Sequence, residues 1–235
     1  MQQDELKALF DQQAASYDTQ WAKTAPIRHC LHLLLGSMFA ELPEEARILC
    51  VGVGTGDELF YLASRHPGWH FTALEPSGAM LEVCRRRAEE EGVTARCDFH
   101  EGYLGSLAPG ELHDAATCFL VSHFMLDQEE RSGFFREIAQ HLKPGGLLAS
   151  SDLASDVAAP HYEVLLRAWM NMMSAADLTE EALARMRTAY AKDVGMLPPA
   201  QVASLIEAGG FERVTPFFQA GLIHAWLSTR SRAVG

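Results

Sequence analysis

The stretch Ile48-Leu-Cys-Val-Gly52-Val-Gly54-Thr-Gly56-Asp57-Glu-Leu59 decides the fold of this chain. An apolar run typical of a buried strand leads into glycines at alternate positions and then into a helical pattern. Glycine at Gly52 and Gly54 lets the backbone turn sharply and approach a ligand with no Cβ in the way. The helix after Gly56 presents unpaired N–H groups and the positive end of its dipole, which suit a carboxylate or a phosphate. The segment therefore predicts a strand, a ligand-binding turn and a helix.

A carboxylate stands where a nucleoside ligand would need one. Glu75 lies nineteen residues after Gly56, at the end of the next predicted strand. From that position a carboxylate can accept hydrogen bonds from both hydroxyls of a ribose. The alternative interpretation is a solvated loop acid, with glycines that only pack strand against helix. Because both features fall at the correct ends of their strands, we favour an adenosine-bearing ligand.

Short apolar strands alternate with helices through the first two thirds of the chain, which predicts βαβ units and a mostly parallel, doubly wound, Rossmann-like α/β sheet. Ser77 is the predicted N-cap of one helix, and Lys143-Pro-Gly-Gly146 predicts a hard turn before the fifth strand. The expected strands are 47–52, 69–75, 95–100, 115–121 and 147–152, and the expected helices are 6–17, 27–39, 56–66, 77–91 and 129–142.

The last third follows another pattern. Residues 160–194 are predicted to be helical, and a further helix is expected from Pro199 to Gly209. Two strands, 211–219 and 222–228, are joined so tightly that they must be antiparallel neighbours. The predicted sheet therefore has seven strands, five parallel ones and a terminal antiparallel hairpin.

The expected organisation is one body in four stretches. They are an N-terminal helical cap (1–42), an α/β core (43–155), a helical insertion (156–197) that roofs the ligand crevice, and the final helix and hairpin of the same core (198–235).

Composition restricts the function classes. The net charge of −12 disfavours general nucleic-acid binding and membrane attachment. Five cysteines without CxxC spacing argue against a disulfide framework or a zinc site, and the acidic amino terminus is unlike a signal peptide. We therefore expect a soluble, cytoplasmic protein. His29 and His32, three residues apart on a predicted helix, are interpreted as partly exposed histidines and not as metal ligands.

The glycine turn departs from a dinucleotide fingerprint, because it reads G-x-G-x-G followed by Asp57, and an acid there disfavours a pyrophosphate. The ordered motifs resemble those of the class I S-adenosylmethionine-dependent methyltransferases, and the opening segment is similar to the F-D-x-x-A-x-x-Y-D start of ubiquinone- and biotin-pathway-type members. The stretches that carry the resemblance are Phe10-Asp-Gln-Gln-Ala14-Ala-Ser-Tyr17-Asp18, Gly52-Val-Gly54-Thr-Gly56, Glu75-Pro-Ser77-Gly-Ala-Met80-Leu, His100-Glu-Gly102-Tyr103-Leu104 and Leu142-Lys-Pro-Gly-Gly146.

The resemblance implies S-adenosyl-L-methionine as the cofactor, and it implies a role for each matching residue. By that resemblance, the methionine part is lined by Gly52, Val53, Gly54 and Gly56, and the ribose is held by Glu75. The adenine is expected to lie against Pro76 and Met80, with its edge closed by Gly102, Tyr103 and Leu104. The resemblance also implies that Phe119 and Leu120 cross beneath the sulfonium and that Tyr17 reaches in from the first helix.

Two positions depart from the family pattern. Cys50 stands where the family usually has an Asp that anchors the amino group, and Asp57 is the candidate substitute. Tyr103 stands where an Asp is common, which suggests that the adenine rests on an aromatic face.

His123 is the candidate catalytic residue. It follows the fourth predicted strand, and an imidazole can take a proton near neutral pH when the acceptor is a hydroxyl or a carbon acid. The alternative is a packing or supporting role. Asp152, which ends the fifth strand, and Tyr17 could touch the substrate, but we interpret them as structural or cofactor-side residues.

The insertion bears on the acceptor, which we expect to be a small molecule. Its Met and Trp side chains suit an apolar or aromatic acceptor, and an exposed apolar stripe would permit a homodimer. The predicted stripe is Val164, Leu165, Ala168, Trp169, Met172 and Met173.

Three alternatives stay open. The chain from Met80 onward also resembles the carboxy-S-adenosylmethionine synthases, in which Arg187 or Arg185 would contact the added carboxylate, although Phe119 replaces the Asn of those enzymes. A nicotinamide-dependent dehydrogenase is disfavoured by the missing third fingerprint glycine. A nucleoside-binding protein without chemistry is the last alternative, and Cys50 encourages it.

Overall fold

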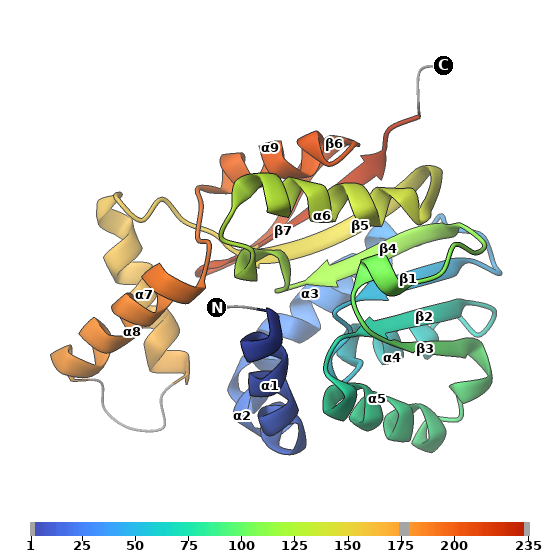
Figure 1. Ribbon diagram of the computed structural model, residues 1–235, viewed down its shortest axis with the longest axis horizontal. Coiled ribbons are helices and arrows are strands. Elements are labelled where there is room, and N and C mark those ends of the chain that lie inside the picture. Colours follow the sequence, from blue (N-terminus) through green and yellow to red (C-terminus); the bar gives the residue numbers. More distant parts are fainter. Residues whose placement is uncertain (1–2, 174–178, 233–235) are drawn as a thin grey trace.

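A seven-stranded sheet runs through the centre of the computed structural model, which describes residues 3–173 and 179–232 (Figure 1). The strand order is β3-β2-β1-β4-β5-β7-β6, and β7 is antiparallel to both of its neighbours. The predicted fold class, with five parallel strands and a terminal hairpin, is therefore confirmed. The strands are β1 (Arg47–Val51), β2 (His70–Glu75), β3 (Cys97–Glu101), β4 (His113–Phe119), β5 (Leu142–Leu153), β6 (Phe211–Ala220) and β7 (Ile223–Arg230).

Helices cover both faces of this sheet. Alternate residues of β1 show why: Ile48 packs beneath α3, α4 and α5, whereas Leu49 packs against α6 and α9 on the other face. The predicted N-cap is confirmed, since the Ser77 hydroxyl accepts from Met80 N at 3.2 Å. The helices are α1 (Gln3–Gln13), α2 (Tyr17–Gln20), α3 (Ala25–Met38), α4 (Asp57–Ala63), α5 (Gly78–Glu90), α6 (Gln128–Gln140), α7 (Pro160–Met173), α8 (Glu180–Asp193) and α9 (Pro199–Ala208).

The hard turn predicted at Lys143-Pro-Gly-Gly146 was wrong, because this segment belongs to β5. The register on β4 steps from the pair His113–Leu142 to the pair Ala115–Leu147, so the glycine-containing segment is taken up as an irregularity of the ladder. Gly145 has a φ of +84°, a conformation that glycine adopts without strain.

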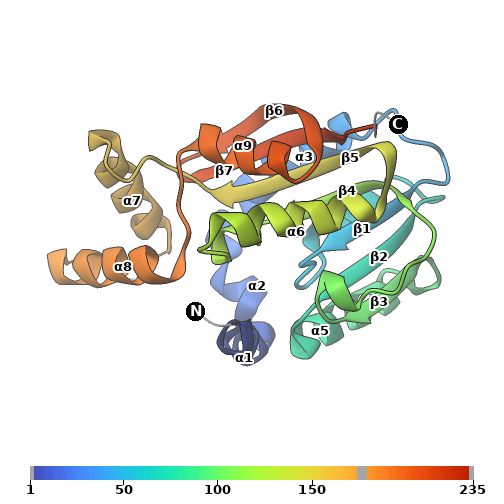
Figure 2. The same cartoon turned by 45° about the horizontal axis from the view of Figure 1, so that its top comes forward.

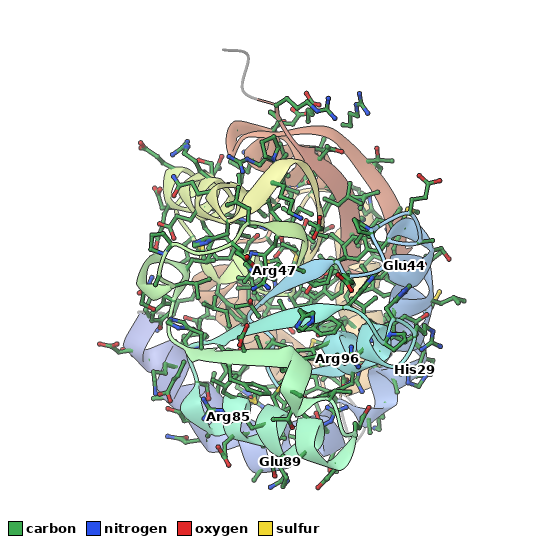
Figure 3. All side chains as sticks on the ribbon, turned by 90° about the vertical axis from the view of Figure 1, so that its right-hand side faces the viewer. His29, Glu44, Arg47, Arg85, Glu89 and Arg96 are labelled. Carbon is green, nitrogen blue, oxygen red and sulfur yellow. The ribbon has the colours of Figure 1, made fainter. Side chains whose placement is uncertain are left out.

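The two ends of the sheet differ in what they support. The carboxyl ends of the parallel strands face the end of the molecule where α1, α2, α7 and α8 lie (Figures 1 and 2). At the opposite end, the Arg96 guanidinium donates to the carbonyls of Ala63, His66 and Trp69 at 3.1, 3.1 and 2.9 Å (Figure 3). Arg96 therefore joins the end of α4 to the start of β2, and the strand ends that face α1 and α7 are left to form a site.

The helical insertion packs on this site, although its apolar stripe differs from the predicted one. The buried side chains of α7 are Tyr162, Leu166, Trp169 and Met170, whereas Val164 is 68% exposed. Part of the predicted helical run, 174–178, lies outside the described residues. Within the described part of the chain, no helix combines the length and apolar character needed to cross a bilayer.

Candidate functional site

One cavity of about 1060 Å³ opens at the carboxyl ends of β1, β2, β4 and β5. Helices α1 and α2, the start of α3, the segment after β4 and α7 complete its wall. The structure brings most of the predicted site residues together there. Those that line the cavity are Tyr17, Gly52, Val53, Gly54, Asp57, Glu75, Pro76, Met80, Tyr103, Leu104, Phe119, Leu120 and His123.

Glu75 holds the glycine turn and the start of α5 in place. Its Oε2 accepts from Gly54 N at 3.0 Å, and its Oε1 accepts from Ser77 N at 2.9 Å. Burial raises the pKa of Glu75, although these two N–H bonds act in the opposite direction. Each carboxylate oxygen has lone pairs beyond the one that its N–H donor uses, so the carboxylate can also accept from a ribose diol.

The glycines of the turn serve different purposes. A Cβ on Gly52, which has a φ of +66°, would lie 2.5 Å from Val121 Cγ2, so the turn needs glycine for its own packing. Gly56 does not line the cavity, and a Cβ there would meet the Phe60 ring at 2.4 Å, so the packing of the turn requires glycine at this position. Gly102 also lies outside the lining, and its N–H donates to the Glu75 carbonyl at 3.1 Å. Gly56 and Gly102 therefore shape the wall without forming it.

Two acids of the opening motif, which the sequence analysis did not single out, fasten the N-terminal helices over the cavity. Asp11 Oδ1 accepts from Ser77 Oγ at 2.6 Å, and Asp18 Oδ1 accepts from Thr55 Oγ1 at 2.7 Å. Their place in the F-D-x-x-A-x-x-Y-D stretch was the available signal. Tyr17, between them, lines the cavity, and burial raises the pKa of its phenol to about 12.

The two departures from the family pattern have clear surroundings. Cys50 is fully buried in the core, and burial raises the pKa of its thiol well above the usual value. Asp57, the candidate substitute, is engaged: Oδ1 pairs with Arg87 Nη1 at 2.8 Å and Oδ2 with Arg28 Nε at 3.1 Å. The Tyr103 ring lines the cavity, and its hydroxyl donates to the Gln3 carbonyl at 3.2 Å.

The expectation that His29 and His32 are both partly exposed was wrong for His32. His29 is exposed on the outer side of α3 (Figure 3), but His32 is only 5% exposed and lines the cavity. Its ring stacks on the Phe119 ring with centroids 6.4 Å apart. Burial lowers the pKa of His32 to about 4, so this imidazole is neutral at physiological pH.

His123 belongs to a buried polar network behind the cavity wall. Asp152 Oδ1 lies 2.9 Å from His123 N and 3.1 Å from His123 Nδ1. Asp152 Oδ2 accepts from Ser122 Oγ at 2.6 Å and lies 3.1 Å from Arg131 Nη2. Arg131 also donates to the Gly195 carbonyl at 2.7 Å, which ties the network to the segment after α8.

The network fixes the tautomer of the His123 ring, that is, which of its nitrogens carries the proton. Burial would raise the pKa of Asp152, but the Arg131 charge and the bonds from His123 and Ser122 outweigh burial and lower it. An ionised carboxylate only accepts hydrogen bonds, so Nδ1 must donate and Nε2 is the nitrogen that can take a proton. Asp152 itself is fully buried and does not line the cavity, which fits the structural role expected for it.

The segment between β4 and His123 is conformationally unusual. Leu120 has a φ of +57°, in the left-handed region that a leucine rarely adopts. Its N–H donates to the Ser151 carbonyl at 2.8 Å, so the chain stays attached to β5 as it leaves β4. The turn leads directly into the short helix Ser122–Phe124, which carries His123.

Apolar side chains, many of them aromatic, make up much of the remaining cavity lining, together with the acids Asp127, Glu130 and Glu137. The Trp21 and Trp169 rings lie 6.1 Å apart, so the N-terminal segment and the insertion meet over the cavity. The lysine and arginine that line it in the described chain, Lys7 and Arg28, are each paired with an acid. The apolar lining comprises Phe10, Trp21, Ile27, Leu31, Phe124, Met125, Leu126, Phe134, Leu153, Trp169 and Ile223.

Arg185 and Arg187, the arginines that a carboxy-S-adenosylmethionine synthase would use, do not line the cavity. Arg185 pairs with Glu181 at 2.8 Å, and Arg187 pairs with Glu163. The structure therefore gives no support to that alternative.

Comparisons with known proteins confirm the resemblance of this chain to the class I S-adenosylmethionine-dependent methyltransferases. Residues 48–146 match a family model described as a methyltransferase domain. The chain is 33% identical over 116 residues to the erythromycin 3''-O-methyltransferase of Saccharopolyspora erythraea. The matched stretch covers 48% of this chain and 37% of that protein. It is also 33% identical over 130 residues to the ubiquinone/menaquinone biosynthesis C-methyltransferase of Bartonella henselae. Here the matched stretch covers 52% of this chain and 46% of that protein.

The solved structures agree on the fold. An O-methyltransferase family protein from Burkholderia thailandensis superimposes with a TM-score of 0.60 at 16% identity, covering 86% of this chain and 57% of that one. The chain spans 24%, 37% and 52% of the length of three curated relatives that it matches.

Proposed function

We propose that the protein transfers a methyl group from S-adenosylmethionine to an oxygen of a small acceptor with an apolar or aromatic body. The observation that carries this proposal is that His123, which Asp152 holds from behind, lines the same cavity as Glu75 and the glycine turn. A base is useful when the acceptor is a hydroxyl, because its proton must leave as the new bond forms.

The cofactor end of the cavity suits the nucleoside. Glu75 can accept from the two ribose hydroxyls, and the apolar side chains of Met80 and Leu104 can flank the adenine. When bound, S-adenosylmethionine supplies a methyl group already activated by the sulfonium charge. What the chain must add is alignment of the acceptor and exclusion of water, and the rings of Trp21 and Trp169 serve the second task.

The apolar rings of the cavity lining suit an apolar acceptor, and its charges disfavour an anionic one. Lys7 and Arg28 are already paired with acids, so neither is available to neutralise an anionic acceptor. A relative with 33% identity is named an O-methyltransferase, which supports oxygen as the accepting atom. A carbon acid is the second candidate, because it also needs a base and another relative with 33% identity is named a C-methyltransferase.

The test is turnover of a panel of phenols, aliphatic alcohols and carbon acids, with S-adenosylhomocysteine formation followed by mass spectrometry. His123→Asn keeps a donor toward Asp152 but removes the base, so kcat should fall by roughly 10²- to 10⁴-fold. Calorimetric affinity for S-adenosylhomocysteine should stay unchanged. His29→Asn, on the exposed side of α3, is the matched control. Full turnover by His123→Asn would remove the proposed role of the base, and no turnover of any acceptor by the wild type would leave only a binding protein.

A further inference from the structure

Glu58 is a buried carboxylate in the cavity wall that the proposed reaction does not use. It lies in the first turn of α4, directly after the glycine turn, and is 8% exposed. Among the residues that the structure describes, one other residue donates a hydrogen bond to it: Thr117 Oγ1 lies 3.4 Å from Oε1. Within the described part of the chain, Glu58 forms no ion pair with a lysine, an arginine or a histidine. A carboxylate placed in this way needs a cation or must hold a proton.

The charges that face Glu58 are committed elsewhere. Arg87, on α5, donates to Asp57 at 2.8 Å, and Arg28, on α3, also pairs with Asp57. The thiols of Cys50, Cys84 and Cys118 interact with Glu58, have raised pKa values and are uncharged at neutral pH. The His32 imidazole, which also lines the cavity, is neutral too, whereas the nearby Asp57 carboxylate is a negative charge that raises the pKa of Glu58 further. Burial accordingly raises the pKa of Glu58 to about 8.

The position of Glu58 relates it to the missing acid of the family pattern. Cys50 occupies the place where the family usually carries an Asp, and its register partner on β4 is Thr117. Because Thr117 contacts Glu58, the Glu58 carboxyl lies over this pair of strand residues, on the same face of the sheet. A carboxylate from the helix thus reaches the region that the strand residue no longer serves.

We propose that Glu58 binds the ammonium group at the amino-acid end of the cofactor, in the role that Cys50 cannot perform and for which Asp57 is not free. This inference rests on the proposed use of S-adenosylmethionine. Binding exchanges one cation for another: the carboxyl proton leaves to solvent, and the ammonium takes its place beside the carboxylate. Between pH 6 and 7.5, affinity should therefore rise with pH.

The experiment compares two nucleosides that differ in the amino-acid end. S-adenosylhomocysteine carries the ammonium group, whereas 5′-methylthioadenosine keeps the adenine, ribose and sulfur but lacks it. Calorimetric titration of Glu58→Gln should show S-adenosylhomocysteine binding weakened about tenfold or more, because a charged hydrogen bond is lost, with 5′-methylthioadenosine binding unchanged. Glu89→Gln, on the outer side of α5 (Figure 3), is the matched control and should bind both as the wild type does.

A measurement on the wild type alone guards against a folding defect in the variant. At pH 7, the heat of S-adenosylhomocysteine binding should depend on the ionisation enthalpy of the buffer, because a proton is released. The heat with 5′-methylthioadenosine reports any proton that Glu75 exchanges at the ribose, so the difference between the two ligands isolates the amino-acid end.

The outcomes separate the two proposals. Equal affinity of Glu58→Gln and wild type for S-adenosylhomocysteine would overturn the role of Glu58 and leave the proposed function standing. Equal weakening of both nucleosides would also overturn it, because the carboxyl would then only shape the pocket. If the wild type binds neither nucleoside, the proposed function itself fails, and this inference fails with it.

Discussion

At the scale of single residues, Glu75 illustrates how one side chain can organise a site. Its two oxygens accept from the glycine turn and from the start of α5, so the two segments that would hold a nucleoside are positioned by the same carboxylate. The sequence predicted this residue because it ends a strand at a fixed distance from the glycines. The engagement of Asp57 with Arg87 and Arg28 could not be predicted, because these partners come from helices distant in the chain.

Glu75→Gln should weaken both S-adenosylhomocysteine and 5′-methylthioadenosine about tenfold, because the ribose is common to the two ligands and the charged acceptor is lost. This common loss distinguishes Glu75 from Glu58. Calorimetry with both ligands measures it, and Glu101→Gln, exposed at the register partner of Glu75 on β3, is the control. Undiminished affinity would mean that the ribose binds elsewhere.

At the scale of elements, the N-terminal helices depend on few anchors. Helix α1 has no buried residue, so its attachment to α5 rests largely on Asp11 and the Ser77 hydroxyl. The amphipathic pattern predicted one helix over 6–17, but the structure ends α1 at Gln13 and continues through a short turn into α2. Hydrophobic periodicity could not show this break, because the anchors that position α2, such as the Asp18–Thr55 bond, are long-range.

Asp11→Ala should loosen α1 without unfolding the sheet, because it removes the acceptor of the Ser77 hydroxyl at the start of α5. Hydrogen exchange of the amides in residues 3–20 should become several-fold faster, whereas exchange in β1 and β4 stays as in the wild type. Gln12→Ala, exposed on the same helix, is the control. Unchanged exchange in α1 would show that other contacts hold the helix.

At the scale of the whole molecule, buried acids make stability depend on pH in opposite directions. The pKa of Glu58 is raised to about 8, so the unfolded chain releases this proton at lower pH than the folded protein does. The stability that Glu58 contributes is therefore present below the unfolded pKa and is lost as pH rises toward 8. The pKa of Asp152 is lowered, so its contribution is present at neutral pH and is lost in acid.

Glu58→Gln cannot ionise, so its stability relative to the wild type should grow between pH 5 and pH 8 in the absence of ligand. The difference should reach a few kcal/mol, since each unit of pKa difference corresponds to about 1.4 kcal/mol. Urea unfolding of both proteins at pH 5, 6.5 and 8 measures it. Parallel stability curves would show that the Glu58 carboxyl ionises in the folded protein as readily as in the unfolded chain.

The global architecture was the most predictable level. Alternating strands and helices, the glycine turn and the tight hairpin each follow from local chemistry, and together they specify the sheet that the structure shows. The irregular start of β5 was not predictable, because its register is decided by pairing with β4. The surroundings of His32 were equally inaccessible, since a helix pattern does not show which of two histidines faces a cavity.

The backbone conformation of Leu120 has a further consequence for efforts to stabilise this protein. Glycine would adopt the left-handed backbone there without penalty, whereas leucine costs roughly 1–2 kcal/mol, yet leucine is present. Replacement by glycine would relax the main chain but remove an isobutyl group from the lining. Leucine at this position therefore accepts a cost in backbone energy and supplies a side chain to the cavity wall, and stabilising mutations sought in this protein should avoid it.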